Sequence, residues 1–316
     1  MEPAITVTGL TKQWTARGGK TAGLRGVSLQ AGAGAVTALL GPNGAGKTTV
    51  IRVLATLLRP DSGQARVGGH DVLREPERVR SLIGLTGQAL SVDGKLSGPE
   101  NLAMFGRLHH LPWPQVRKRS ARLIGAFDLG SAGKKAVQTY SGGMRRKLDL
   151  ALSLIGEPAI LFLDEPTTGL DPASRLALWD IIRGLVSQGT TVLLTTQYLH
   201  EADALAGSVV FINAGRVVAA GTPAELKARA GQAQIDLVAA SAADFERLAA
   251  ALRGFRIVAD VSRRTVRTAV QDIGALSDIA AAAVRADARI DSYAVHEPDL
   301  NDVYFQLAGH KAGEAV

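Results

Sequence analysis

The chain has 316 residues, of which 46% are hydrophobic, and a formal net charge of +7. It is therefore long enough to form two domains, each with a buried core. It contains no cysteine, which excludes disulfides and thiolate metal sites. No stretch approaches the roughly 18–20 uncharged apolar residues that span a bilayer, and we expect no secretion signal because MEPAITVTGL has no basic start followed by an apolar region. The positive charge permits contact with nucleic acid or anionic lipid, although arginines scattered over an ordinary surface are the favoured interpretation.

The first part of the chain alternates between strand-like and helical patterns. Residues 5–14 predict a strand, and residues 27–41 predict two strands separated by a glycine-rich turn. A helix is expected over residues 47–58. Between residues 88 and 140 the character becomes helical, and one helix there follows an LPWP turn and carries an apolar stripe made of Val116, Leu123, Ile124 and Phe127.

Two strongly apolar runs return in the middle of the chain. Residues 159–166 and 189–197 are near-continuous apolar segments, as expected for strands that are covered on both faces. A predicted helix over residues 172–187 separates them. Strand, helix and strand in this order indicate an α/β fold with a parallel sheet and a helical insertion.

The last part of the chain has shorter elements. A domain boundary is expected within residues 215–231, and strands are expected at residues 235–240, 264–270 and 289–295. An alanine-rich helix lies between two helices recognised by apolar faces, which consist of Phe245, Leu248 and Leu252 in the first and of Leu300, Val303, Tyr304 and Leu307 in the second. We therefore expect a first domain over residues 1–224 and a small α+β domain over residues 232–316, without an obvious catalytic cluster.

A glycine-rich segment between a strand and a helix predicts a phosphate site. Residues 41–48, GPNGAGKT, match G-x-x-x-x-G-K-[ST]. Glycines let several backbone N–H groups point inward, and the following helix directs its positive end at the same point. Lys47 would reach the β- and γ-phosphate oxygens, and the Thr48 hydroxyl is placed for Mg²⁺. A glycine-rich turn with a chance lysine is the alternative. The residues predicted to contact ATP here are Gly41, Pro42, Asn43, Gly44, Ala45, Gly46, Lys47, Thr48 and Thr49.

An acidic pair follows the apolar run at residues 160–163. Asp164 and Glu165 would stand at the carboxyl end of a buried strand, where ligands bind in parallel sheets. Asp164 would hold magnesium, directly or through water, and Glu165 would orient and deprotonate an attacking water. On its own such a pair is an ordinary helix cap or surface feature. Together with the phosphate loop it predicts that the nucleotide is cleaved.

These motifs, with three further segments, resemble the ATP-binding subunits of ABC transporters, and among them the bacterial daunorubicin/doxorubicin-resistance type of export ATPase. Residues 140–155 resemble the signature sequence of the family, and residues 168–172, TGLDP, resemble its D-loop. Residues 297–310 are similar to the end of the C-terminal domain in the export subgroup. The resemblance implies a P-loop NTPase domain of the ABC ATPase type, a helical subdomain at about residues 88–150, and the small C-terminal domain.

The resemblance also assigns roles to single residues. Trp14 matches the aromatic residue that stacks on adenine, and Gln88 matches the Q-loop glutamine expected near the nucleotide and Mg²⁺. The D-loop match adds Asp171 to the predicted nucleotide site. The signature would form a second phosphate-binding surface at Ser141, Gly142 and Gly143. Ser141 would cap the helix, the two glycines would expose their backbone N–H groups, and the helix would direct the positive end of its dipole at the phosphate.

The family further implies partners. Two copies of the chain would form a head-to-tail homodimer with ATP at the interface, each signature closing the nucleotide site of the other copy. A separate membrane permease would be contacted through the segment between Gln88 and Tyr140. The expected location is peripheral, at the cytoplasmic face of the cell membrane, with a drug-like or lipophilic compound as cargo and no nucleic acid partner. The absence of cysteine fits this location.

The chain departs from the family at two positions. Met144 stands where a glutamine usually follows the signature glycines, and Gln197 stands where the family usually has its switch histidine. Glutamine can hydrogen-bond the γ-phosphate or water but transfers no proton near neutral pH. We expect Glu165 to be the catalytic base and Gln197 to sense the γ-phosphate, with modest turnover. His200 is the alternative, disfavoured because helix geometry would direct it elsewhere.

Other functions are less compatible with the sequence. Soluble ABC ATPases that act on nucleic acid or ribosomes usually carry two cassettes or long coiled coils, whereas this chain has one phosphate loop, one signature and no heptad run. A regulator that binds ATP without cleaving it is disfavoured by Glu165. The charges of Arg145, Arg146 and Lys147 are expected on a solvated helix face.

Overall fold

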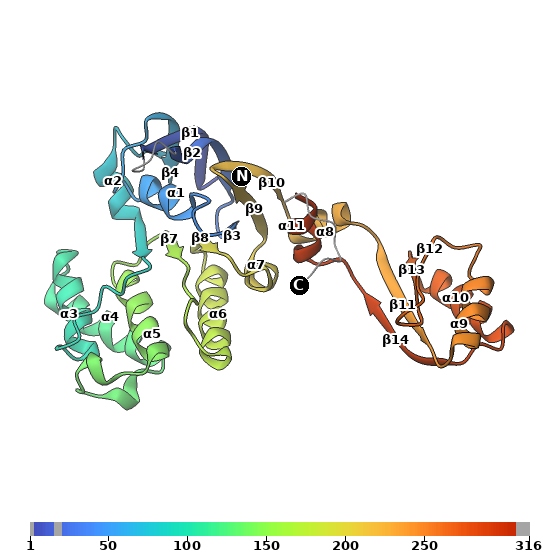
Figure 1. Cartoon of the computed structure of the whole chain (residues 1–316). Coiled ribbons are helices and arrows are strands. Elements are labelled where there is room, and N and C mark those ends of the chain that lie inside the picture. The colour runs from blue at the N-terminus through green and yellow to red at the C-terminus, as the bar shows by residue number, and fades with distance from the viewer. Residues whose placement is uncertain (1–2, 16–20, 308–316) are drawn as a thin grey trace. The chain divides into compact units, whose positions relative to one another are not determined.

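The computed structural model describes residues 3–15 and 21–307, which fall into two compact units, Met1–Pro223 and Ala224–Val316 (Figure 1). In these described ranges the first unit contains two sheets and the second contains one, and each unit has its own buried apolar cluster. Within the described residues, no helix is both long and apolar enough to cross a membrane.

The first unit contains two sheets. The antiparallel sheet has the order β2-β1-β4-β5 and consists of β1 (Ile5–Thr15), β2 (Thr21–Ala31), β4 (Ser62–Val67) and β5 (His70–Asp71). The second sheet has the order β10-β9-β3-β8-β7-β6 and is parallel except for the pair of β9 and β10. Its strands are β3 (Val36–Leu40), β6 (Ile83–Thr86), β7 (Ile160–Asp164), β8 (Thr191–Thr196), β9 (Ser208–Asn213) and β10 (Arg216–Gly221).

In the described part of the first unit, four helices each follow a strand, and three others form a separate group between β6 and β7 in the chain. They are α1 (Lys47–Leu54), α2 (Pro76–Leu82), α3 (Gly98–Leu108), α4 (Trp113–Ala126), α5 (Gly142–Ser153), α6 (Pro172–Ser187) and α7 (Leu199–Leu205), with short 3₁₀ helices at Gly130–Ala132 and Val137–Thr139. In Figure 1, α3, α4 and α5 lie together as one helical group. This is the helical insertion that the sequence predicts.

One apolar cluster joins α1 to both sheets. It includes Val50 and Leu54 of α1, Ile5 and Leu24 of the antiparallel sheet, and Phe162 of β7, all of them fully buried. Each such side chain contributes about 1.5–3 kcal/mol by leaving water. Burial of both faces of the parallel strands is the reason why their sequences are near-continuous apolar runs.

The parallel strands end at the same level. In the register of the sheet, Leu40 of β3 lies opposite Thr196 of β8, and Asp164 of β7 lies opposite Thr195 of β8. The residues that follow these three strands therefore emerge side by side at one edge of the sheet. This edge is where ligands bind in open α/β sheets.

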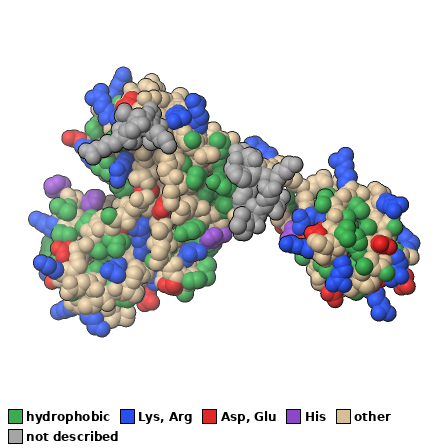
Figure 2. Space-filling view, viewed as in Figure 1, with side chains coloured by type: hydrophobic (Ala, Val, Ile, Leu, Met, Phe, Trp, Pro, Cys, Tyr) green, Lys and Arg blue, Asp and Glu red, His purple; other side chains and the backbone are tan. Residues whose placement is uncertain are grey.

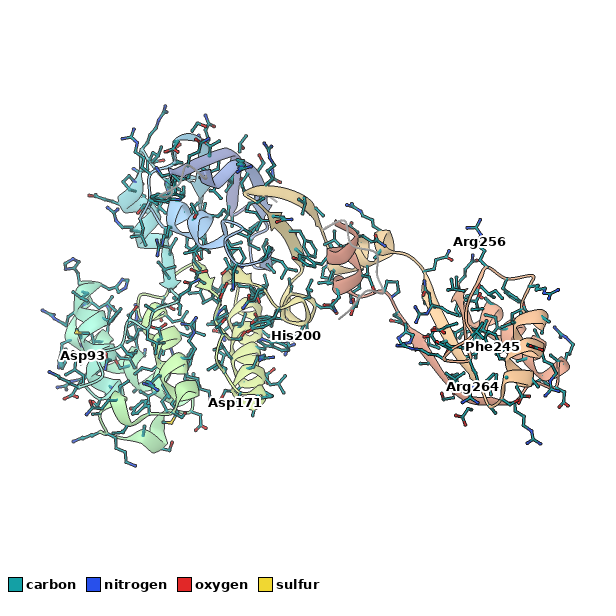
Figure 3. The ribbon with its side chains drawn as sticks, viewed as in Figure 1. Asp93, Asp171, His200, Phe245, Arg256 and Arg264 are labelled. Carbon is teal, nitrogen blue, oxygen red and sulfur yellow. The ribbon has the colours of Figure 1, made fainter. Side chains whose placement is uncertain are left out.

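The second unit is built on an antiparallel sheet of order β12-β13-β11-β14. Its elements are α8 (Pro223–Ala230), β11 (Ala233–Ala239), α9 (Ala242–Ala251), β12 (Ile257–Asp260), β13 (Thr265–Val270), α10 (Ile273–Arg285), β14 (Ile290–His296) and α11 (Leu300–Leu307). Phe245 and Leu248 of α9 pack with Ile279 of α10 against Leu237 and Val266 of the sheet. Figure 3 shows Phe245 inside this unit.

The fold class expected from the sequence is confirmed, and α6 has the predicted bounds. The helix predicted over residues 47–58 is shorter, because Thr56 has a left-handed φ of 62° directly after the helix end. The segments that form β4, β5, β6, β9, β10 and β12 are not among the strands predicted from the sequence. In the closing helix Leu300 and Val303 are buried as expected, while the side chain of Leu307 lies outside the described residues.

Candidate functional site

The loop between β3 and α1 requires glycine at several points. Gly44 and Gly46 have φ values of 78° and 110°, which side chains rarely adopt. A Cβ at Gly41 would lie 2.1 Å from the carbonyl oxygen of Ile212, and one at Gly46 would lie 2.6 Å from Leu24 Cδ2. The backbone N–H groups can therefore curl around a phosphate only because these positions carry no side chain.

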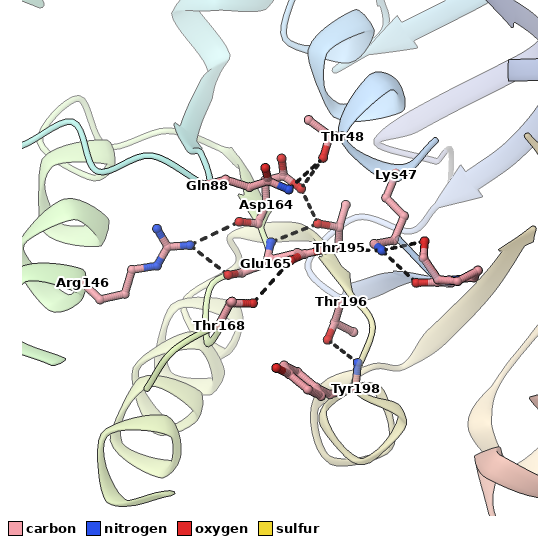
Figure 4. A network of polar contacts seen from close by, with 12 residues as sticks. Lys47, Thr48, Gln88, Arg146, Asp164, Glu165, Thr168, Thr195, Thr196 and Tyr198 are labelled. Carbon is pink, nitrogen blue, oxygen red and sulfur yellow. Dashed lines mark hydrogen bonds and ion pairs between the residues drawn. The ribbon is translucent and has the colours of Figure 1, made fainter. Parts of the chain in front are cut away.

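Lys47 is held over this loop. The residue is only 4% exposed, and its Nζ donates hydrogen bonds to the carbonyl oxygens of Gly41 at 2.7 Å and Pro42 at 3.2 Å. The same Nζ lies 3.3 Å from Glu165 Oε1 (Figure 4). One ammonium group thus stands between the phosphate loop and the acidic pair, where it can reach the oxygens of a bound triphosphate.

Oxygen-bearing side chains meet beside Lys47. The Thr48 hydroxyl donates to Asp164 Oδ1 at 3.2 Å, and Gln88 Nε2 donates to Thr48 Oγ1 at 3.2 Å (Figure 4). A hydroxyl, a carboxylate and an amide are ligands of the hard type that Mg²⁺ binds together with water and phosphate oxygens. Among the residues that the structure describes, no cluster of three or more His, Cys, Asp or Glu side chains could hold a metal ion by itself. The residues present fit a magnesium ion that shares its coordination with a nucleotide.

Glu165 has an unusual backbone conformation. Its φ is 50°, in the left-handed region, which costs a non-glycine residue about 1–3 kcal/mol unless its surroundings hold it. The Glu165 N–H donates to the hydroxyl and the carbonyl oxygen of Thr195, at 3.0 and 3.1 Å. Its carboxylate contacts Lys47 and accepts from the Thr168 hydroxyl at 3.4 Å. The backbone turn aims the carboxylate at the space above the phosphate loop.

Most of the predicted nucleotide site surrounds one cavity. This cavity has a volume of about 180 Å³ and is lined by Trp14, Gly23, Asn43, Gly44, Gly46, Lys47, Thr48, Thr49, Gln88 and Glu165. All of these except Gly23 are predicted site residues. Lys12 Nζ lies over the ring of Trp14, 5.3 Å from its centroid. Because the residue is nevertheless 46% exposed, the indole remains accessible for stacking. Asp164 is buried, and the loop backbone of Gly41, Pro42 and Ala45 connects the lining residues without lining the cavity.

The signature segment reaches a second, wider cavity of about 720 Å³. This cavity extends from Asn43 and Gly44 of the phosphate loop to Gly142 at the start of α5. Ser141 caps α5 by accepting a hydrogen bond from the Met144 N–H at 3.2 Å. Ser141 and Gly142 are both exposed, so the positive end of α5 faces solvent.

Gly143 and Asp171 lie where α5 meets α6 and line neither cavity. A Cβ at Gly143 would lie 2.5 Å from Ser174 Oγ, so glycine allows the close approach of the two helices. Asp171 caps α6 by accepting from the Ser174 N–H at 2.9 Å and from its hydroxyl at 2.6 Å (Figure 3). These hydrogen bonds lower the pKa of Asp171.

Gln197 follows directly after the end of β8. It is half-buried and lines neither of the two cavities. His200, at the second position of α7, turns to α6, where its Nε2 lies 2.9 Å from Arg175 Nη1. Because a guanidinium can only donate, this nitrogen accepts the hydrogen bond. The ring also lies near Tyr198 and Trp179, with centroids 5.7 and 6.0 Å apart.

Two residues of the site are not among the predicted ones. Thr195 donates to Asp164 Oδ1 at 2.6 Å while it accepts from Glu165. The signal that indicates it is the change from apolar residues to threonine at the carboxyl end of β8. Arg146 is only 6% exposed, so the prediction that it lies on a solvated helix face is wrong. Arg146 and Asp149, three residues apart on α5, form an ion pair at 3.4 Å. This spacing is a recognisable signal for a paired charge on a helix, although it does not indicate burial.

Comparison with known proteins agrees with the geometry. The family model described as ABC transporter matches residues 24–168. The chain is 49% identical to the daunorubicin resistance ATP-binding protein DrrA3 of Streptomyces coeruleorubidus, over 98% of this chain and 96% of the relative. It is 48% identical to the daunorubicin/doxorubicin resistance ATP-binding protein DrrA of Streptomyces peucetius, over 98% and 94%. A solved ATP-binding subunit of an ABC transporter is 27% identical, with a TM-score of 0.63 over 72% of this chain and 92% of that one.

Replacing Thr195 by valine should destabilise the first unit. The residue is fully buried, and Thr195→Val removes one donor to Asp164 and one acceptor of Glu165. We expect the free energy of unfolding to fall by about 1–3 kcal/mol. Urea denaturation followed by tryptophan fluorescence measures this in the full chain, since Trp14, Trp113 and Trp179 all belong to the first unit.

Thr37→Val is the matched control. Thr37 of β3 is equally buried, but its hydroxyl has no hydrogen-bond partner among the described residues. Removing that hydroxyl should leave stability unchanged or raise it. An equal loss of stability in both variants would contradict the role assigned to the Thr195 hydroxyl.

Proposed function

This chain belongs to the ABC transporter family and is an ATP-hydrolysing enzyme, and we propose that it is the ATPase subunit of an exporter for a drug-like or lipophilic compound. The observation that carries the proposal is the meeting of Lys47, which follows β3, with Asp164 and Glu165 at the end of β7, on the two sides of β8. The class of cargo is supported by the relatives, which are named for resistance to daunorubicin and doxorubicin.

The same side chains would bind the nucleotide and its metal. In the proposed complex the backbone of residues 41–48 and the Lys47 ammonium bind the phosphates, and Trp14 stacks on adenine. Thr48, Gln88 and Asp164 would hold Mg²⁺. When bound, the metal ion would neutralise charge on the phosphate oxygens.

Glu165 is proposed to act as the base of hydrolysis. Its carboxylate stands at the end of β7 beside Lys47 and Thr168, so it is oriented from two sides. From there it would orient a water molecule and accept its proton. Gln197, next to the end of β8, would hydrogen-bond the γ-phosphate, and Asp171 would contribute from the D-loop.

Two partners belong to the proposal. The exposed start of α5, with Ser141, Gly142 and the neighbouring Gly143, would bind the γ-phosphate held by a second copy of the chain, so that ATP lies in a homodimer interface. A separate permease would contact the helical group α3–α5, with the ATPase peripheral at the cytoplasmic face of the membrane. In Figure 2, Lys and Arg side chains are spread over the visible surface without gathering in one patch, so this face offers no support for a nucleic acid partner.

Glu165→Gln should separate binding from hydrolysis. Loss of the general base is expected to lower kcat by about 100-fold or more, while the dissociation constant for ATP stays close to that of the parent. Steady-state ATPase assays and calorimetric titration with ATP measure the two quantities. Glu246→Gln, at an exposed position of α9, is the control. Unchanged turnover in Glu165→Gln would exclude this carboxylate as the base.

Gln197→Ala compared with His200→Ala tests the switch position. Loss of one hydrogen bond to the γ-phosphate, worth about 1–1.5 kcal/mol, should lower kcat about 10-fold in Gln197→Ala. His200→Ala should keep the turnover of the parent, because its ring contacts α6. A loss of turnover in His200→Ala alone would show that the assignment is reversed.

Transport is tested by producing this chain together with the permease proposed above. Inverted vesicles that contain both proteins should accumulate an anthracycline when ATP is added, and Lys47→Ala should abolish the accumulation. The ATPase rate should also depend on the permease. Absence of both effects, together with salt-sensitive co-purification of RNA, would favour an ABC ATPase that acts on nucleic acid.

A further inference from the structure

A buried guanidinium lies where the elements of the proposed hydrolysis site meet. Arg146 of α5 is 6% exposed and uses all three of its nitrogens. Its Nε donates to the carbonyl oxygen of Pro166 at 2.7 Å, and its Nη2 donates to those of Asp164 at 3.2 Å and Glu165 at 3.1 Å. Figure 4 shows the last two hydrogen bonds. One side chain thus binds three consecutive carbonyl groups at the carboxyl end of β7, those of Asp164, Glu165 and Pro166.

The remaining nitrogen of Arg146 faces the segment that carries Gln88. Its Nη1 donates to the Gly87 carbonyl oxygen at 2.9 Å and contacts Asp149 Oδ2 at 3.4 Å. Asp149 in turn accepts from the Ser91 N–H at 2.7 Å. The backbone on both sides of Gln88 is therefore attached to α5 through this ion pair.

We propose that Arg146 is a positioning residue for ATP hydrolysis, which holds the Glu165 carboxylate and the Gln88 amide in their working positions through the backbone. The proposal rests on the function proposed above, in which Glu165 is the base. Glu165 adopts its left-handed φ of 50° between two sets of hydrogen bonds. Thr195 binds its N–H from one side and Arg146 binds its carbonyl oxygen from the other.

The charge of Arg146 suits this place. Burial lowers the pKa of the guanidinium, and the carboxylates of Asp149, Asp164 and Glu201 counteract this effect. A guanidinium is not deprotonated in proteins, so the group remains a donor only. A lysine at this position has three rotatable donors on a point charge and cannot match a planar set of carbonyl groups as well.

Arg146 also relates the hydrolysis site to the exposed start of α5. It lies four residues after Gly142, one helical turn along the same face. A shift of α5, caused by a phosphate bound at its N-terminus, would move the carbonyl groups that Arg146 holds. Closure of the proposed dimer and the orientation of Glu165 would in this way be linked.

The test compares Arg146→Gln, Arg146→Lys and Arg146→Ala with the parent in the full chain. Misplacement of the base by about 1 Å is expected to lower kcat about 10- to 100-fold in Arg146→Gln, with the ATP dissociation constant close to the parent value. The melting temperature should fall, because Asp149 loses its buried partner, and turnover is therefore compared at a temperature at which every variant is folded. Arg146→Lys should lose less. Millimolar guanidinium, far below denaturing concentrations, should restore part of the kcat of Arg146→Ala. Lys147→Ala, at the adjacent half-buried cation, should behave as the parent with and without guanidinium.

Several results would overturn the proposal. Turnover of Arg146→Gln within about twofold of the parent would exclude a positioning role. Arg146 would be shown to support only the fold if all three variants lost ATP binding or the folded state. The same conclusion would follow if guanidinium failed to restore the turnover of Arg146→Ala. Glu165→Gln in the same assay separates the two proposals. If Glu165→Gln is inactive while the Arg146 variants are active, this inference alone is wrong, and if Glu165→Gln is active, the proposed role of Glu165 is wrong.

Discussion

The register of the parallel sheet is the constraint on which the site depends. Leu40 lies opposite Thr196 and Asp164 opposite Thr195, so β3, β7 and β8 end together. A slip of one residue would turn every side chain of a strand to the other face, and burial of both faces by apolar clusters opposes it. The phosphate loop, the acidic pair and Gln197 are close to one another because they follow strands held in this register.

The site combines strain with the hydrogen bonds that stabilise it. Glu165 has a left-handed backbone and a carboxylate only 3.3 Å from Lys47. Such a conformation persists only where surrounding groups hold it. Here these groups come from α5, which precedes β7 in the chain, and from β8, which follows it. The geometry of the Glu165 carboxylate therefore depends on two elements that are separate in the sequence.

The sequence predicts the parts of the site that local chemistry determines. The phosphate loop is recognised because glycines, a lysine and a threonine occur at fixed spacing within eight residues, and Gly41 and Gly46 meet the steric limits that require glycine. The burial of Arg146 could not be found in this way. Its partners lie 18 to 20 residues later and 59 residues earlier in the chain, and a run of three cations is usually solvated. Strands such as β10, whose residues alternate between exposed and half-buried, carry a weaker pattern than buried strands and depend on pairing with a neighbour.

The exchange of the family's usual histidine for Gln197 is compatible with this arrangement for a structural reason. The end of β8 is fixed by groups other than the side chain at position 197. Thr195 binds both acidic residues, and the Thr196 hydroxyl accepts from the Tyr198 N–H at 2.9 Å (Figure 4). These hydrogen bonds persist whichever side chain follows Thr196, so the carboxylates keep their positions. Since an amide transfers no proton near neutral pH, the proton of the attacking water would go to Glu165 in the proposed mechanism. Turnover would then depend on the hydrogen bonds that Thr195 and Arg146 make to the Glu165 backbone.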